Sequence, residues 1–124
     1  MHTTIMTQEY SPGLHLLLTL RVNDVNLLTS LDEFISFSKE LIANEDLKIV
    51  GISSHSFDTC GFTAAICLME SHICIHTWPE FNQLTLDVYL CNYLKDNSTK
   101  VLKIGDAFKA YFEAEVLNET LVNR

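Results

Sequence analysis

Positive charge is scarce in this chain, and so are the residues that interrupt regular structure. Eight Lys and Arg stand against sixteen Asp and Glu, a formal net charge of -8, and the basic residues are scattered. Nucleic-acid and anionic-membrane binders need clustered basic side chains, so the sequence argues against both partners. Only two prolines and four glycines occur, and 48% of the residues are apolar. This composition predicts one globular domain over residues 1–124.

Long apolar runs are absent as well. No stretch approaches the ~18 apolar residues that a membrane span requires. The start, MHTTIMTQEY, lacks the basic and apolar regions of a secretion signal. We therefore expect a cytoplasmic protein that does not contact a membrane. Residues 1–12 are polar and aperiodic and end in Ser11-Pro12, which predicts a loose N-terminal arm.

Cysteine occurs four times but never as a CxxC pair; the positions are Cys60, Cys67, Cys74 and Cys91. A secreted disulfide framework is not indicated, and we expect reduced thiols. By default each is a small buried hydrophobe, so only its position can give one of them a chemical role.

Alternating apolar residues predict strands over residues 14–22 and 84–91. Apolar runs of strand length predict further strands at 47–57, 62–69 and 73–78, and residues 115–122 are compatible with a closing edge strand.

Helical spacing of apolar residues occurs in two segments. Asp24 or Asn26 can cap a helix that extends to about Asn44, and Ser98 or Thr99 can cap a second one. We write the order as βαβββαβ, an α+β fold. It predicts a two-layer α/β sandwich with a mostly antiparallel sheet and two helices on one face.

The segment Glu70–Glu80, ESHICIHTWPE, carries an unusual density of reactive groups beside an expected hairpin turn. Glu70-Ser71 has three interpretations: a polar turn, a Ser-His hydrolase, or a bond that cleaves itself. The hydrolase lacks a GxSxG nucleophile elbow. In self-cleavage the serine hydroxyl attacks the preceding carbonyl, and a base then eliminates the ester. His76 is the candidate base, expected within reach of a backbone that folds back at the turn.

Other residues of this segment have competing interpretations. His72, Cys74 and His76 alternate onto one strand face, and with Cys91 or Cys60 they suggest zinc. That set is disfavoured because zinc sites prefer paired ligands across tight turns. By default Phe57 and Trp78 are core aromatics and Glu80 is a solvated charge; as a pair, the two aromatics would form a slot for a flat base.

The segment closely resembles the signature of the prokaryotic S-adenosylmethionine decarboxylases, small pyruvoyl-dependent proenzymes of polyamine synthesis. The resemblance has no gap between His15 and Cys91. It includes Gly13, His15, His55, Phe57, Gly61, Asp87 and Cys91.

The resemblance implies cleavage between Glu70 and Ser71 into a β chain, residues 1–70, and an α chain, residues 71–124. Ser71 would become the pyruvoyl group that forms a Schiff base with the substrate amine. No metal and no pyridoxal phosphate would be needed. The resemblance also implies a homodimer of processed protomers.

The resemblance assigns the remaining roles residue by residue. His76 would be the processing base, Cys91 the proton donor to the substrate carbon, and Thr63 an assistant in processing, where the family has serine. Phe57 and Trp78 would sandwich the adenine, and Glu80 would bind the ribose hydroxyls.

Departures from the pattern leave the substrate open. Thr19 replaces an acidic residue, Phe81-Asn82 replaces Tyr-Gly, and Ala64, Met69 and Asn92 replace small residues. S-adenosylmethionine is the leading substrate, because Phe57, Trp78 and Glu80 are all retained. The alternatives are a basic amino acid, ornithine or arginine, or an unprocessed non-catalytic paralogue.

Overall fold

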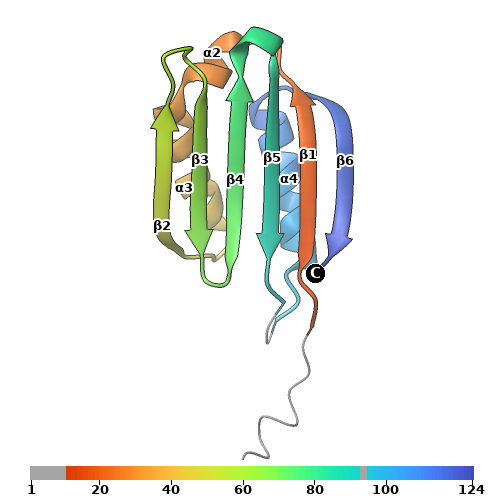
Figure 1. The fold of residues 1–124 in the computed structure, drawn as a ribbon. Helices are drawn as coiled ribbons and strands as arrows, with labels where there is room; N and C mark the ends of the chain where they lie inside the picture. The colour runs from red at the N-terminus through yellow and green to blue at the C-terminus, as the bar shows by residue number, and fades with distance from the viewer. Residues whose placement is uncertain (1–10, 93–94) are drawn as a thin grey trace, which may run out of the picture.

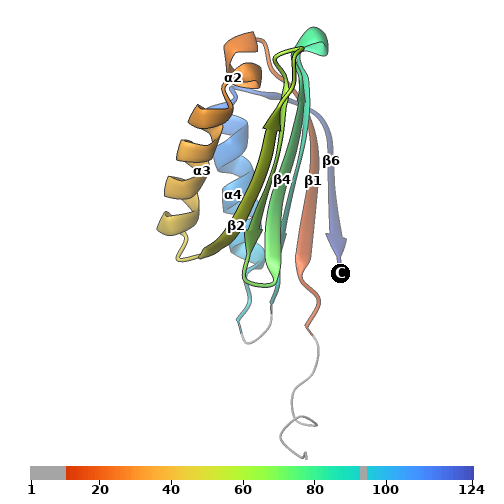
Figure 2. The same ribbon diagram turned by 60° about the vertical axis from the view of Figure 1, so that its left-hand side comes forward.

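Six antiparallel strands form one sheet in the order β2-β3-β4-β5-β1-β6, and the helices cover one of its faces (Figures 1 and 2). The computed structural model describes residues 11–92 and 95–124. The elements are β1 Leu14–Arg21, α2 Val25–Thr29, α3 Leu31–Asn44, β2 Ile49–Ser56, β3 Phe62–Leu68, β4 Ser71–Trp78, the 3₁₀ turn η1 Pro79–Phe81, β5 Gln83–Leu90, α4 Ser98–Tyr111 and β6 Glu115–Asn123.

The alternation of apolar residues decides which face of the sheet is buried. Along β1, β3, β4 and β5 every second residue packs against the helices, while its neighbours point to the other face. Phe34 of α3 lies between Phe62 of β3 and Phe108 of α4, at ring-centroid distances of 5.5 and 5.6 Å. The helix-free face therefore displays the polar and reactive half of each strand, as antiparallel sheets allow.

The predicted fold class is confirmed: the structure is an α+β sandwich with an antiparallel sheet. The shorthand βαβββαβ is one strand short, because four strands, β2 to β5, follow one another between the helices. The strands at 14–22, 62–69 and 84–91 and the edge strand at 115–122 are confirmed within a residue or two. Most of the predicted loose arm, residues 1–10, lies outside the described residues.

The single helix predicted up to Asn44 is wrong, because the structure contains two helices separated at Ser30. The hydroxyls of Thr29 and Ser30 both donate to the backbone oxygen of Asn26, at 3.2 and 2.7 Å, and compete with the helical ladder there. Asp24 does cap α2, since its Oδ1 accepts from the backbone N–H of Asn26 at 3.0 Å.

Helix α4 begins one residue away from the predicted cap. Ser98 is its first residue, and Asn97 is the cap. In the described part of the chain, no helix is long and apolar enough to cross a membrane.

Candidate active site

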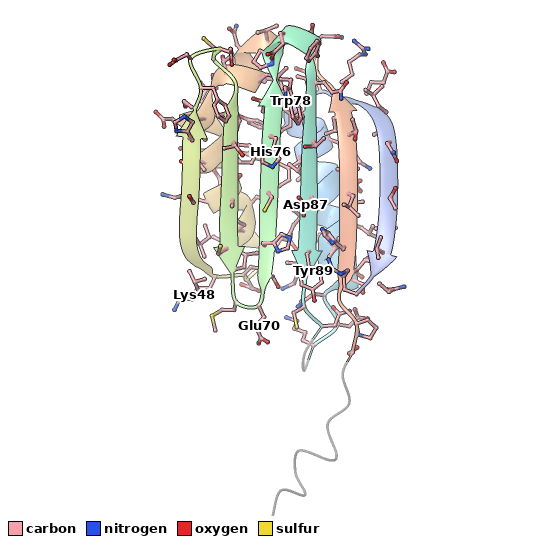
Figure 3. The ribbon with its side chains drawn as sticks, in the orientation of Figure 1. Lys48, Glu70, His76, Trp78, Asp87 and Tyr89 are labelled. Carbon is pink, nitrogen blue, oxygen red and sulfur yellow. The ribbon has the colours of Figure 1, made fainter. Side chains whose placement is uncertain are left out.

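The β3–β4 hairpin places the Glu70-Ser71 bond at the lower edge of the sheet in Figure 3. Leu68 pairs with Ser71, so the connection consists of Met69 and Glu70 alone. Glu70 has a φ of 57°, a left-handed conformation that costs a non-glycine residue about 1–2 kcal/mol. The residue before the predicted cleavage bond is therefore strained, and it is exposed.

Ser71 and Cys91 lie side by side at this end of the sheet. The backbone N–H of Cys91 donates to Ser71 Oγ at 2.9 Å, and Asn97 Nδ2 donates to the carbonyl of Cys91 at 2.8 Å. All three residues line a cavity of about 320 Å³. Asn97 Oδ1 is buried and finds no partner among the described residues. The structure thus brings together the predicted nucleophile and the predicted proton donor.

Thr63 and His76 form a second cluster on the helix-free face, where β3 pairs with β4. Thr63 Oγ1 lies 3.2 Å from the backbone oxygen of Ile75 and 2.5 Å from His76 Nδ1. A hydroxyl carries one proton. When Thr63 donates it to Ile75, its oxygen accepts Nδ1–H from His76, and the imidazole Nε2 keeps its lone pair. This arrangement is that of a positioned base.

Phe57, Trp78 and Glu80 line one cavity of about 300 Å³ together with His76. The aromatic side chains are 46% and 38% exposed, so neither is the core residue that its type suggests by default. Gly61 allows the β2–β3 loop to approach β4, because a Cβ there would lie 2.8 Å from the Thr77 carbonyl oxygen. The loop is closed by a hydrogen bond from Phe57 N–H to the Gly61 carbonyl at 2.8 Å.

The two clusters do not meet within one chain. Strand β4 is extended from Ser71 to Trp78, so the five residues from Ser71 to His76 span about 16 Å. The prediction that the turn folds His76 back onto Ser71 is wrong for a single chain. Thr63, which pairs with His76, is equally far from the Glu70 carbonyl. Figure 3 shows this separation, with His76 and Trp78 in the upper half and Glu70 at the lower edge.

The zinc set suggested by the sequence is not gathered into a site. Among the described residues, the one group of His, Cys, Asp or Glu ligand atoms close enough for a metal is His15, His72 and Asp87. Cys74 shares the strand face of His72, but burial and the nearby Asp87 raise the pKa of its thiol, which favours the neutral form that binds metals poorly.

Hydrogen bonds explain the His15 group without a metal. Arg124 Nη1 lies 2.9 Å from His15 Nδ1, and a guanidinium can only donate, so that nitrogen must accept. His15 Nε2 then carries the proton and donates it to Asp87 Oδ2 at 2.8 Å, and His72 Nε2 approaches the same oxygen at 3.1 Å. Sequence patterns did not predict this network, because its members come from three strands and the C-terminus.

The family model described as S-adenosylmethionine decarboxylase matches residues 14–124 of this chain. The chain belongs to the S-adenosylmethionine decarboxylase family. The match covers all the described strands and helices, and so includes both clusters of the site.

Individual relatives come from bacteria and archaea. An "S-adenosylmethionine decarboxylase proenzyme" of Clostridium botulinum is 35% identical over 99 residues, covering 72% of this chain and 84% of that protein. One of Archaeoglobus fulgidus is 31% identical over 101 residues, covering 82% and 84%. The crystal structure of the adenosylmethionine decarboxylase from Aquifex aeolicus superposes with a TM-score of 0.81 at 25% identity, covering 94% of this chain and 92% of that one.

Proposed function

We propose that this chain is a self-processing decarboxylase that removes the carboxyl group of S-adenosylmethionine. One observation carries the proposal: Phe57, Trp78 and Glu80 line a single cavity with His76, so the aromatic slot and the ribose-binding acid share one space. The names of the relatives support the substrate. The negative charge of the chain, -8, suits a substrate that carries a sulfonium cation.

Processing begins at the strained turn. Ser71 Oγ attacks the Glu70 carbonyl carbon, a C–O bond forms, the C–N bond breaks, and the nitrogen takes up the hydroxyl proton. A base then removes the Cα proton of residue 71, and the Cβ–Oγ bond breaks, so that Glu70 leaves as a free carboxylate. Water replaces the nitrogen, which departs as ammonia, and residue 71 becomes a pyruvoyl group. Strain at Glu70 is relieved when the bond breaks.

The residues around Ser71 fit a pyruvoyl group and its substrate. The Cys91 backbone N–H, 2.9 Å from Ser71 Oγ, fixes the end of β4. A pyruvoyl carbonyl supplies an electron sink for the pair that decarboxylation leaves behind. The Cys91 thiol holds the proton that this carbon needs. No metal or pyridoxal phosphate takes part in the proposed reaction.

A second copy of the chain completes the site. Ser71 and Cys91 lie at one end of β4, whereas Thr63, His76 and the aromatic slot lie toward the other. Two copies can pack with their helix-free faces together, related by a two-fold axis that lies between the sheets and runs perpendicular to the strands. The strands of the two copies then run in opposite directions, so the lower end of each sheet lies against the upper half of the other. We therefore propose a homodimer in which His76 of one copy serves Ser71 of the other. The exposed Leu17 side chain, on the helix-free face of β1, would be covered.

We place the enzyme in the cytoplasm, where its product would feed polyamine synthesis. Glu80 would bind the ribose hydroxyls, and Phe57 and Trp78 the two faces of the adenine. None of these contacts selects for ornithine or arginine, which have no base and no ribose.

Intact-mass analysis followed by an assay of carbon dioxide release tests the function. We expect two fragments divided between Glu70 and Ser71, and release from S-adenosylmethionine but not from ornithine or arginine. Ser71→Ala should give a single uncleaved chain. A wild-type chain that stays at 14.1 kDa after prolonged incubation would favour the non-catalytic paralogue. If carbon dioxide is released only from ornithine or arginine, the pyruvoyl-dependent decarboxylation stands, but S-adenosylmethionine is refuted as the substrate.

A further inference from the structure

Three lysines surround the bond that the proposed function cuts. Lys48 precedes β2, Lys95 lies between β5 and α4, and Lys100 lies in the first turn of α4, yet all three line the cavity that contains Glu70 and Ser71. Lys48 and Glu70 are labelled at the same lower edge of the sheet in Figure 3. The fold therefore gathers positive charge there in a chain that has little of it.

These lysines lack the close carboxylate partners that other lysines of the chain have. Lys103 lies 3.5 Å from a Glu45 carboxylate oxygen, and Lys109 lies 2.6 Å from one of Glu119. Within residues 11–92 and 95–124, none of the three cavity lysines forms such an ion pair. Lys100 Nζ instead donates to the backbone oxygen of Glu45. Desolvation and the neighbouring Lys95 lower the pKa of Lys100, so the uncut chain disfavours its charge.

Cleavage changes the charge of this cavity in one direction. Ordinary hydrolysis of a peptide bond creates one carboxylate and one ammonium group. In the proposed processing, the amine of Ser71 departs as ammonia, so only the new α-carboxylate of Glu70 remains. Before the cut, three lysines in the cavity lining stand against two carboxylates, those of Asp46 and Glu70; after it, three stand against three.

We propose that Lys48, Lys95 and Lys100 form a carboxylate-binding site whose ligand is the new C-terminus at Glu70. The proposal rests on the proposed function, since it requires the cut. Paired with the lysines, the cut end of the β chain stays docked at the end of β3 beside Ser71. Such pairing also offsets the repulsion between Lys95 and Lys100, adding to the attraction that Asp46 and Glu45 already exert on Lys100 in the uncut chain.

The test compares Lys100→Met with Lys103→Met in two backgrounds, the self-cleaved wild type and uncleaved Ser71→Ala. Both substitutions keep an unbranched side chain on α4, but Lys103 does not line the cavity. In the cleaved protein we expect Lys100→Met to lower the Tm by roughly 3 °C. It should also speed carboxypeptidase trimming of the β chain about fivefold. In Ser71→Ala, Lys100→Met should lower the Tm less than in the cleaved protein, because only the hydrogen bond to the Glu45 backbone oxygen is lost there.

Lys103→Met should shift the Tm equally in both backgrounds, because its Glu45 partner is unaffected by the cut. Lys95 is itself exposed, so Lys95→Met provides a second variant if Lys100→Met does not fold or cleave. Equal effects of the cavity variants in the two backgrounds, or no effect after cleavage, would overturn the carboxylate site and leave the proposed function intact. A wild-type chain whose mass shows no cleavage overturns both.

Discussion

The two halves of β4 carry different kinds of chemistry. At the lower end are a strained residue, a hydroxyl and a thiol, and the cavity there is lined by three lysines and two carboxylates as well as by apolar side chains. Farther up are an imidazole held by a hydroxyl and a cavity walled by two aromatic rings. In the proposed function, the lower end breaks the Glu70-Ser71 bond and the upper half recognises the adenine base. Because one extended strand holds both, their separation is fixed by backbone geometry, and only another chain can bring them together.

Mixing two inactive variants gives the largest effect and tests the comparison directly. Ser71→Ala and His76→Ala should each remain uncleaved when expressed alone. Co-expressed, they form mixed dimers in which one site combines an intact Ser71 with an intact His76 from the other copy. We expect fragments only from the His76→Ala chain, identified by its mass, and up to half of the sites of each mixed dimer to become active.

A matched control combines Ser71→Ala with Ser71→Ala carrying a distinguishing tag, which leaves no intact nucleophile. Fragments should be absent there. Cleavage of His76→Ala expressed alone, or the absence of cleaved chains in the mixed dimers, would show that His76 of one copy does not serve Ser71 of the other.

Removal of the Cys91 thiol should impair decarboxylation of the substrate while leaving self-cleavage at Glu70-Ser71 intact. Cys91→Ala keeps Ser71 and the backbone N–H that donates to its Oγ, so cleavage should proceed. Loss of a positioned acid should lower kcat by about 10²–10⁴-fold. Fragment yield and carbon dioxide release measure the two steps. Cys67→Ala, an exposed thiol on β3, is the control and should leave both steps unchanged. An unimpaired rate in Cys91→Ala would remove Cys91 from its assigned role.

Removal of the upper aromatic wall should affect binding alone. Stacking of an aromatic side chain on a base contributes about 1–3 kcal/mol, so Trp78→Ala should raise KM for S-adenosylmethionine roughly 5- to 150-fold while cleavage at Ser71 continues. Phe81→Ala is the control, since Phe81 is 67% exposed and lies outside the cavity lining. Equal KM values for the two variants would contradict the aromatic slot.

The sequence predicted what depends on local pattern and missed what depends on the path of the chain. Glu70-Ser71 was placed at a turn because apolar runs of strand length flank it. From the sequence, Ser71 and His76 were expected to lie close together because they are only five residues apart. In the structure both lie on one extended strand, so the separation along the chain becomes a separation in space. The helix break at Ser30 was missed because the apolar spacing continues through it. The three cavity lysines come from separate elements, so no spacing along the chain connects them.

The smallest predicted effect concerns a contact outside both halves of β4. Lys109 on α4 pairs with Glu119 on the edge strand β6 at 2.6 Å, and this hydrogen bond raises the pKa of Lys109. A raised lysine pKa adds stability that is complete below the unfolded value and is lost as the pH rises through the folded one. At side-chain exposures of 24% and 37%, the pair should contribute about 0.2–1 kcal/mol. Lys109→Met should therefore lower the Tm by a few degrees at pH 8, and the difference from wild type should shrink as the pH rises past the raised pKa of Lys109. Because this contact touches neither cavity, fragment yield and KM should match wild type, and a change in either would show that the β6 edge is coupled to the site.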